Sequence, residues 1–328
     1  MEDLHLSKET NQILEEIRQK GPIRVSELLE NFGISSKTAH KHLKILQNKR
    51  LISKQGTVPE VYYSIYVESN PIAVITTKDD LLIENNYIYL SPSGKFKKGL
   101  EGFEDWCNRN NFNINKEKQQ YVKTFKKMKK FSKDGLIKSK NRILSGKYEV
   151  DLDQVFFNDF YTIGHFGKTK LGQLIYIAKT SQNISLVLDI VKIIKPAIDN
   201  IIENYDIKYI GYIPPTVDRK IQIMDLLKES LKLEKKIIEI SKLPSSTKVA
   251  QKTLRKLEDR IENAQDTIVV KPTQSIDGNV LLIDDATGSG ATLNEVSKKI
   301  RKLSTKKIKI IGYTVVGSYK GFDVISEV

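Results

Sequence analysis

The feature that most constrains the fold is the stretch VLLIDDATGSGATLNE, residues 280–295. Its first four residues, Val280–Ile283, are all aliphatic, a pattern typical of a strand that is buried on both faces of a parallel sheet. Two adjacent carboxylates, Asp284 and Asp285, follow at the carboxyl end of this predicted strand. A loop rich in glycine and hydroxyl residues then leads into a segment that can begin a helix. A strand, a loop and a helix in this order predict an α/β domain.

Strand-like and helical segments alternate through the whole of residues 151–328. The strand patterns cover residues 154–163, 207–213, 236–240, 280–283 and 307–316, and the helical patterns cover residues 185–205, 221–233 and 293–303. Such alternation predicts βαβ crossovers and a doubly wound parallel sheet with helices on both faces. Ligands of such sheets bind at the carboxyl ends of the strands, which is where Asp284 and Asp285 lie.

Composition narrows the class of protein further. The chain has 328 residues, one cysteine, Cys107, and four histidines, so an internal disulfide is impossible and a zinc site built by the protein is not expected. Residues 1–20 are charged and no apolar run is long enough to cross a bilayer, so we expect a cytoplasmic protein without a membrane partner. The formal net charge of +14 favours a polyanionic partner, although a lysine-rich surface can also simply be solvated.

The first 68 residues predict a winged helix-turn-helix domain. Ser7 can cap a first helix that Gly21-Pro22 ends, and a second short helix is expected over residues 25–31. Ser35 or Ser36 can cap a third helix. Residues 51–65 contain two β-prone runs joined by glycine and proline, as expected for a hairpin.

This N-terminal segment resembles bacterial winged-helix transcription regulators in the phrase FGISSKTAHKHLKILQNKRLISK, residues 32–54. Ala39, Leu43 and Leu46 form the apolar stripe of the third helix. The short polar and cationic residues of the opposite face, which we expect to contact double-stranded DNA, are Ser36, Lys37, His40, Lys41 and Lys44. The alternative is a winged helix that serves protein contacts.

Residues 69–150 are expected to form a basic connecting region of mixed strands and helices. The sequence predicts strands over residues 72–77 and 81–90, with a turn at residues 84–86, and a helix over residues 99–108. The lysine-rich segment after it, residues 116–133, is either a second nucleic-acid surface or a linker helix that buries its aromatic residues and solvates its lysines.

The loop after the predicted strand of residues 280–283 has the composition of an anion-binding site. Its glycines let the backbone approach a ligand, and its amides precede a helix N-terminus. The predicted phosphate-binding residues are Ala286, Thr287, Gly288, Ser289, Gly290, Ala291 and Thr292. Carboxylates that accept hydroxyl groups, next to amides that hold a phosphate, describe a site for a ribose 5-phosphate.

Residues 280–292 resemble the thirteen-residue phosphoribosyl pyrophosphate (PRPP) motif of the type I phosphoribosyltransferases. The resemblance implies that Asp284 and Asp285 bind the ribose hydroxyls and that residues 286–292 bind the 5-phosphate. Gly288 stands where the family usually has threonine. A nucleotide-binding P-loop fits less well, because Ala291 stands where it needs lysine. A methyltransferase loop also fits less well, because Thr287 stands where it needs glycine.

The likeness extends to the ComF branch of that family. Residues 171–179 resemble the first helix of its domain and end in Lys179. The resemblance implies a pyrophosphate loop that contains Pro215, Thr216, Arg219 and Lys220, and a mobile segment over residues 241–267 that contains Gln251 and Arg260. The cysteine ribbon that usually precedes the ComF domain is absent, and IQIMDLL replaces the arginine- and glycine-rich residues that usually follow the pyrophosphate loop. Arg219 with Lys220, and Arg260 with Glu258 or Glu262, can also be ordinary surface pairs.

Two functions follow from this organisation. In the first, a transcription regulator senses PRPP or a related nucleotide, bound with Mg²⁺, and acts as a homodimer on two DNA half-sites. In the second, the C-terminal domain is an active phosphoribosyltransferase of nucleotide metabolism that transfers the pentosyl group of PRPP to an unidentified base. The joining of a DNA-binding domain to a metabolite-binding fold favours the first function.

Overall fold

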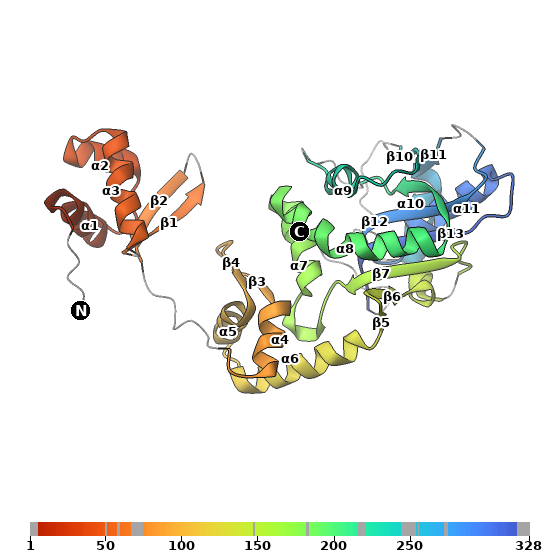
Figure 1. The fold of residues 1–328 in the computed structure, drawn as a ribbon, viewed down its shortest axis with the longest axis horizontal. Helices are drawn as coiled ribbons and strands as arrows, with labels where there is room; N and C mark the ends of the chain where they lie inside the picture. Colours follow the sequence, from red (N-terminus) through yellow and green to blue (C-terminus); the bar gives the residue numbers. More distant parts are fainter. Residues whose placement is uncertain are drawn as a thin grey trace. The chain divides into compact units, whose positions relative to one another are not determined.

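The computed structural model describes residues 6–49, 51–57, 60–66, 75–146, 148–181, 184–215, 219, 221–243, 254, 256–271 and 275–319. The chain divides into two compact units, Met1–Ala73 and Val74–Val328 (Figure 1).

The N-terminal unit contains three helices followed by an antiparallel pair of strands, as the sequence predicts. These elements are α1 (Lys8–Lys20), α2 (Val25–Phe32), α3 (Ser36–Asn48), β1 (Ile52–Thr57) and β2 (Glu60–Ile65). Ser7 caps α1, because its hydroxyl accepts a hydrogen bond from the Thr10 amide at 3.3 Å. Ser35 caps α3 in the same way, accepting from the Thr38 amide at 3.2 Å. The three helices and the hairpin enclose one apolar core centred on Ile17, Leu28, Leu43, Leu46 and Tyr63.

A mostly parallel sheet forms the centre of the C-terminal unit. Within the described residues its strand order is β5-β6-β7-β13-β12-β8-β9. The strands are β5 (Ser132–Lys133), β6 (Leu136–Lys138), β7 (Gln154–Phe160), β13 (Ile310–Gly317), β12 (Asn279–Thr287), β8 (Ile207–Tyr212) and β9 (Lys236–Ile238). The pairs from β7 to β9 are parallel, whereas β5 and β6 are antiparallel to their neighbours. The five parallel strands lie where the sequence predicts them.

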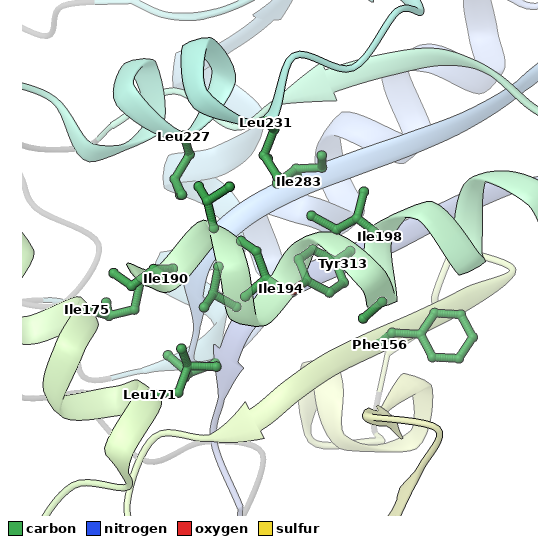
Figure 2. Packing of buried hydrophobic residues seen from close by; sticks show 14 of the residues in the cluster. Phe156, Leu171, Ile175, Ile190, Ile194, Ile198, Leu227, Leu231, Ile283 and Tyr313 are labelled. Atoms are coloured by element: carbon green, nitrogen blue, oxygen red, sulfur yellow. The ribbon is translucent and has the colours of Figure 1, made fainter. Parts of the chain in front are cut away.

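Helices cover the sheet on both faces, which confirms the doubly wound prediction. One face packs against α7 (Lys170–Ser181), α8 (Ile184–Asn204) and α9 (Ile223–Leu231). Figure 2 shows this core, in which Ile194 and Ile198 of α8 lie near Tyr313 of β13 and Ile190 of α8 lies near Ile175 of α7. The alternate side chains of β12 are also fully buried, and α10 (Leu257–Thr267) and α11 (Ala291–Leu303) lie behind the sheet in Figure 1.

Two 3₁₀ turns and a separate pair of strands are short. They are η1 (Lys140–Gly146), η2 (Gly164–Phe166), and the antiparallel pair β10 (Ile240–Lys242) and β11 (Ile268–Val270). Among them, η1 connects the antiparallel edge of the sheet to the carboxyl end of β12.

The segment expected as a connecting region is structurally continuous with the sheet, since β5 and β6 extend it. Before them come α4 (Lys78–Asn86), β3 (Ile88–Leu90), β4 (Phe96–Lys98), α5 (Gly99–Arg109) and α6 (Ile114–Lys129). The helix predicted over residues 99–108 is α5. The lysine-rich segment forms α6, which buries Tyr121 and Met128 and exposes most of its lysines.

The strand predicted over residues 81–90 is wrong, because residues 78–86 form α4 and only residues 88–90 are extended. The reason is a capping box. The Thr77 hydroxyl accepts from the Asp80 amide at 3.0 Å, and the Asp80 carboxylate accepts from the Thr77 amide at 3.1 Å. This local pairing starts a helix despite the β-prone residues that follow. Of the other strand predicted here, residues 72–74 lie outside the described residues and residues 75–77 are not in a strand.

Asp80 also links α4 to α6, and this predicts a pH-dependent stability. Its carboxylate lies 3.0 Å from the Lys118 ammonium. Burial by itself would raise the pKa of Asp80, but Lys118 and the Thr77 and Thr76 hydroxyls outweigh it and hold the pKa well below its usual range. The folded-state pKa is therefore lower than that of the unfolded chain, so Asp80 stabilises the fold above about pH 4, and this stabilisation decreases as the pH falls below that value.

We expect Asp80→Ala to lower the free energy of unfolding by about 2 kcal/mol at pH 7, because it removes a cap and a buried ion pair. The effect should shrink at acidic pH. Fluorescence of Trp106, the chain's one tryptophan, during urea unfolding measures it. The matched control is Asp79→Ala, because Asp79 is half exposed and lies 3.4 Å from Lys126; an equal effect of both variants would contradict the assignment.

Candidate functional site

The acidic pair lies at the carboxyl end of β12, inside the strand rather than after it. β12 continues to Thr287, so the first two residues of the predicted loop are still strand. The reason is that β13 runs beside it in parallel, pairing Asp284 with Thr314 and Thr287 with Gly317. Beyond that pair the Ser318 amide donates to the Thr287 carbonyl at 3.1 Å. Asp284 and Asp285 therefore lie within the hydrogen-bonded part of β12.

The predicted phosphate loop is short, because α11 already begins at Ala291. Residues 288–290 make the turn, and Gly290 adopts a left-handed conformation with φ of 77°. The Ser289 hydroxyl accepts from the Ala291 amide at 3.4 Å. The first amides of a helix have no carbonyl partner within it and carry partial positive charge, so the start of α11 is suited to an anion.

A lysine on α7 balances the charge of the acidic pair. Lys179 Nζ lies 3.0 Å from Asp285 Oδ1, and the two side chains are only 12% and 13% exposed. Asp284 Oδ1 accepts a hydrogen bond from the Asp285 amide at 2.8 Å. Two adjacent carboxylates repel each other, and a nearly buried cation offsets that repulsion. The sequence places Lys179 at the end of a helix, but it does not show that α7 carries this lysine to Asp285.

The turn η1 supports the phosphate loop from the side of β6 and β7. The Leu144 amide donates to the Ser289 carbonyl at 2.7 Å. A Cβ atom at Gly290 would lie 2.7 Å from Cβ of Ile143, so the turn and the loop are in direct contact. Leu144 has a φ of 51°, unusual for leucine. It is buried with Leu257 of α10 and Ala291 of α11. Sequence reasoning missed this contact, because residues 140–146 carry no phosphate-binding pattern.

Arg142 fixes η1 to the carboxyl ends of β7 and β13. Its guanidinium lies 5.0 Å from the ring centroid of Phe131 and 5.3 Å from those of Phe160 and Tyr319. Its Nη1 donates to the Tyr319 carbonyl at 2.5 Å. A guanidinium enclosed by three rings gains cation–π attraction while its hydrogen bond fixes the backbone. Arg142 therefore anchors the turn that contacts the predicted phosphate loop.

The residues present fit a sugar phosphate. Asp284 and Asp285 are acceptors at one edge, and the start of α11 offers donors after Gly290. Thr287 is 3% exposed, and its hydroxyl has no hydrogen-bond partner among the described residues. Such a buried hydroxyl is unusual in a folded protein and is consistent with a polar ligand in this loop.

The structure describes only some of the other predicted site residues. The Ile213 amide donates to the Ile283 carbonyl at 2.9 Å, which places the start of the predicted pyrophosphate loop beside β12. Pro215 is exposed and Arg219 is half-buried. Three predicted residues, Thr216, Lys220 and Gln251, lie outside the described residues.

Arg260 lies on α10 and is buried rather than on the helix surface. Its Nε donates to the Leu254 carbonyl at 2.8 Å, and burial lowers the pKa of its guanidinium. Leu257, one turn earlier, packs against Ala291 at the start of α11. The described end of the predicted mobile segment, residues 257–267, therefore reaches the phosphate loop through α10.

The predicted DNA-contacting residues share one face of α3. Ala39, Leu43 and Leu46 are buried against the other helices. The five predicted contact residues are all exposed: Ser36, Lys37, His40, Lys41 and Lys44. This exposed face runs from Ser36 to Lys44, about two turns of helix. A recognition helix places such a face in a major groove.

Comparison with known families identifies the N-terminal domain. Residues 10–56 match the DeoR-like helix-turn-helix domain. The N-terminal unit is thus a DNA-binding domain of the kind that transcription regulators carry. No curated protein matches the chain. Among the described residues, no helix is long and apolar enough to span a membrane, and no three histidine, cysteine or acidic side chains are grouped to hold a metal ion.

The contact between Gly290 and Ile143 predicts the effect of Gly290→Ala. A residue with a side chain is strained at this φ, and its Cβ would also collide with Ile143, so we expect unfolding free energy to fall by about 3 kcal/mol. Urea unfolding followed by Trp106 fluorescence measures the loss.

The matched control is Gly94→Ala, because Gly94 has a φ of 76° and no atom within 4 Å of an added Cβ. We expect Gly94→Ala to lower the unfolding free energy by about 1 kcal/mol, because it introduces backbone strain without a collision. Adding Ile143→Gly to Gly290→Ala removes the Cβ that the new side chain would meet, so the combined loss should be smaller than the sum of the two single losses. Strictly additive losses would contradict the contact.

Proposed function

We propose that this protein is a transcription regulator whose C-terminal domain binds PRPP, or a related nucleotide, with Mg²⁺ as an effector. The observation that carries the proposal is the position of Asp284 and Asp285 near the carboxyl end of strand β12. A glycine turn and the start of α11 follow this strand end. The DeoR-like helix-turn-helix domain in the same chain supplies the second half of the proposal.

Each part of the site has a role that suits its chemistry. The carboxylates of Asp284 and Asp285 accept hydrogen bonds from two vicinal ribose hydroxyls. Residues 288–292 direct amides to the 5-phosphate, and Thr287 offers its buried hydroxyl beside them. Mg²⁺, bound through the oxygens of the ligand's pyrophosphate, would neutralise the negative charge of that group.

Lys179 prepares the site for this ligand. Its ammonium lies 3.0 Å from Asp285 Oδ1 and orients that carboxylate, so the other carboxylate oxygen can accept a hydrogen bond from a ribose hydroxyl. A lysine held in this way costs little reorganisation when the ligand binds. Arg219 and Lys220 follow β8 and supply the cationic donors that we assign to the pyrophosphate.

Binding of PRPP at this site would regulate transcription by changing the affinity of the protein for DNA. We propose that the protein acts as a homodimer and that each α3 enters a major groove of one half-site. PRPP and DNA then change each other's affinity by the same factor. Because η1, α10 and α7 all contact the site, the ligand has several elements through which it can alter the arrangement of the dimer.

Calorimetry with magnesium-loaded PRPP tests the effector site. We expect the wild-type protein to bind, and Asp284→Asn or Asp285→Asn to weaken binding by about tenfold or more, because each removes a charged acceptor of a hydroxyl group. The control is Asp199→Asn, since Asp199 lies on α8 and pairs with Lys195. The absence of heat with folded wild-type protein would contradict the proposal. Pyrophosphate release that depends on both aspartates would instead indicate an active phosphoribosyltransferase.

The salt dependence of DNA binding tests the α3 face. Lys37→Ala and Lys41→Ala should each reduce the slope of log K against log salt by about one, if each lysine contacts one phosphate. The control is Lys20→Ala, because Lys20 is exposed on α1 and pairs with Glu16. Equal slopes for all variants would remove these lysines from the interface. Repeating the titration with DNA from upstream of the protein's own gene, with and without PRPP, measures the coupling between PRPP binding and DNA binding.

A further inference from the structure

The outer face of α6 carries a row of lysines. This helix, Ile114–Lys129, contains six lysines and one acidic residue, Glu117, which is buried. At 3.6 residues per turn, four exposed lysines fall within about 60° of one another around the helix axis, on the side away from the buried Tyr121 and Met128. These four residues, called the α6 lysine row below, are Lys116, Lys123, Lys127 and the C-cap residue Lys130.

Carboxylates do not neutralise the α6 lysine row. Among the described residues, none of its four lysines is in an ion pair, whereas Lys126, on the flank of the row, lies 3.4 Å from Asp79 of α4. Lys123 and Lys127 are four residues apart, and like charges at that spacing destabilise a helix. A face that serves only solubility usually mixes charges of both signs. The row therefore favours a partner that supplies the negative charge.

The helix dipole accounts for only part of the row. Lys127 and Lys130 lie at the C-terminal end of α6, where the partial negative charge of the helix stabilises cations. Lys116 lies in the first turn, where the partial charge is positive, and Lys123 lies in the middle of the helix. Helix stability therefore does not explain the row as a whole.

The side chains between these lysines are suited to a phosphate backbone. They are the amides of Asn115, Gln119 and Gln120, which can donate hydrogen bonds to phosphate oxygens. Among the exposed side chains of this face there is no aromatic ring on which an unpaired base could stack. There is also no apolar side chain that could enter a membrane. The face thus suits duplex DNA better than a single strand or a lipid surface.

The row is long and its backbone is firmly held. From Lys116 to Lys130 it extends over about 21 Å, and B-DNA carries one phosphate charge for about every 1.7 Å of its axis. The inner side of α6 packs against α4 and α5 (Figure 1). There the Tyr121 ring lies edge-on to Phe103 and Phe166, with centroids 5.6 Å and 5.2 Å apart. Binding a partner therefore does not require this backbone to become ordered.

We infer that the α6 lysine row is a second DNA-binding surface, which contacts the phosphate backbone of duplex DNA without reading its sequence. Unpaired lysines and phosphates are complementary in charge. The partner is DNA because the same chain carries a DeoR-like helix-turn-helix domain. The inference depends neither on the proposed PRPP site nor on the proposed homodimer.

The salt dependence of duplex binding by the full chain tests the row. In the test variant all four lysines of the row become glutamine, which is uncharged and has a similar helix propensity. We expect the slope of log K against log salt to fall by about 0.9 for each lysine that contacts a phosphate, and by at least about two for the four together. Phosphate contacts carry no sequence information. Affinity should therefore fall by a similar factor for DNA from upstream of the protein's own gene and for an unrelated duplex of equal length.

The matched control removes the same charge from another part of the C-terminal unit. Four exposed lysines of α8, α9 and the turn after α9 become glutamine: Lys192, Lys228, Lys232 and Lys235. Equal slopes for the wild type and the test variant, or an equal decrease in the control, overturn the inference. Circular dichroism confirms that each variant is folded. If the fourfold variant is unstable, Lys123→Gln alone should still reduce the slope by about one.

Two further arms separate this surface from the others. Vesicles of phosphatidylserine test a lipid partner: binding to them that the test variant loses, with duplex binding unchanged, overturns the inference. Combining the test variant with Lys37→Ala and Lys41→Ala should give additive decreases in slope, because the α3 face and the α6 lysine row then contact different phosphates. PRPP calorimetry is independent of this assay, so either result can fail without the other.

Discussion

The constraint on which the C-terminal unit depends is the burial of β12 on both faces between two parallel neighbours. The fully buried part of β12 is aliphatic, and Asp284 and Asp285 come where the strand becomes partly exposed near its carboxyl end. Their mutual repulsion is offset by Lys179, which approaches from α7 with little exposure to solvent. A nearly buried carboxylate that lost this cation would be left with an uncompensated charge. The position of α7 and the chemistry of the strand end are therefore linked.

The phosphate loop is held by parts of the chain that are distant in sequence. η1 contacts it through Leu144 and Ile143, α10 reaches it through Leu257, and Arg142 ties η1 to the ends of β7 and β13. A short glycine turn has few contacts of its own, so this support determines its geometry. The same arrangement explains why residues 75–150 are part of the C-terminal unit: their last strands and η1 form one wall of the candidate site.

In the proposed regulator the N-terminal unit carries the DNA-binding domain and the C-terminal unit carries the proposed effector site. The N-terminal unit folds around its own core and exposes one cationic face of α3. The C-terminal unit has its candidate site at the carboxyl edge of the sheet.

The sequence by itself determined the parallel strands, the helices of the N-terminal unit and the candidate loop, because burial imposes periodic apolar patterns and caps and glycines impose local geometry. It failed over residues 81–90, where the pairing of Thr77 with Asp80 starts a helix that the β-prone composition conceals. Tertiary structure alone decided the partner of Asp285, the contact of Ile143 with Gly290 and the enclosure of Arg142. Those contacts join residues far apart in the chain, and their geometry depends on how whole elements pack, which no local pattern of residues encodes.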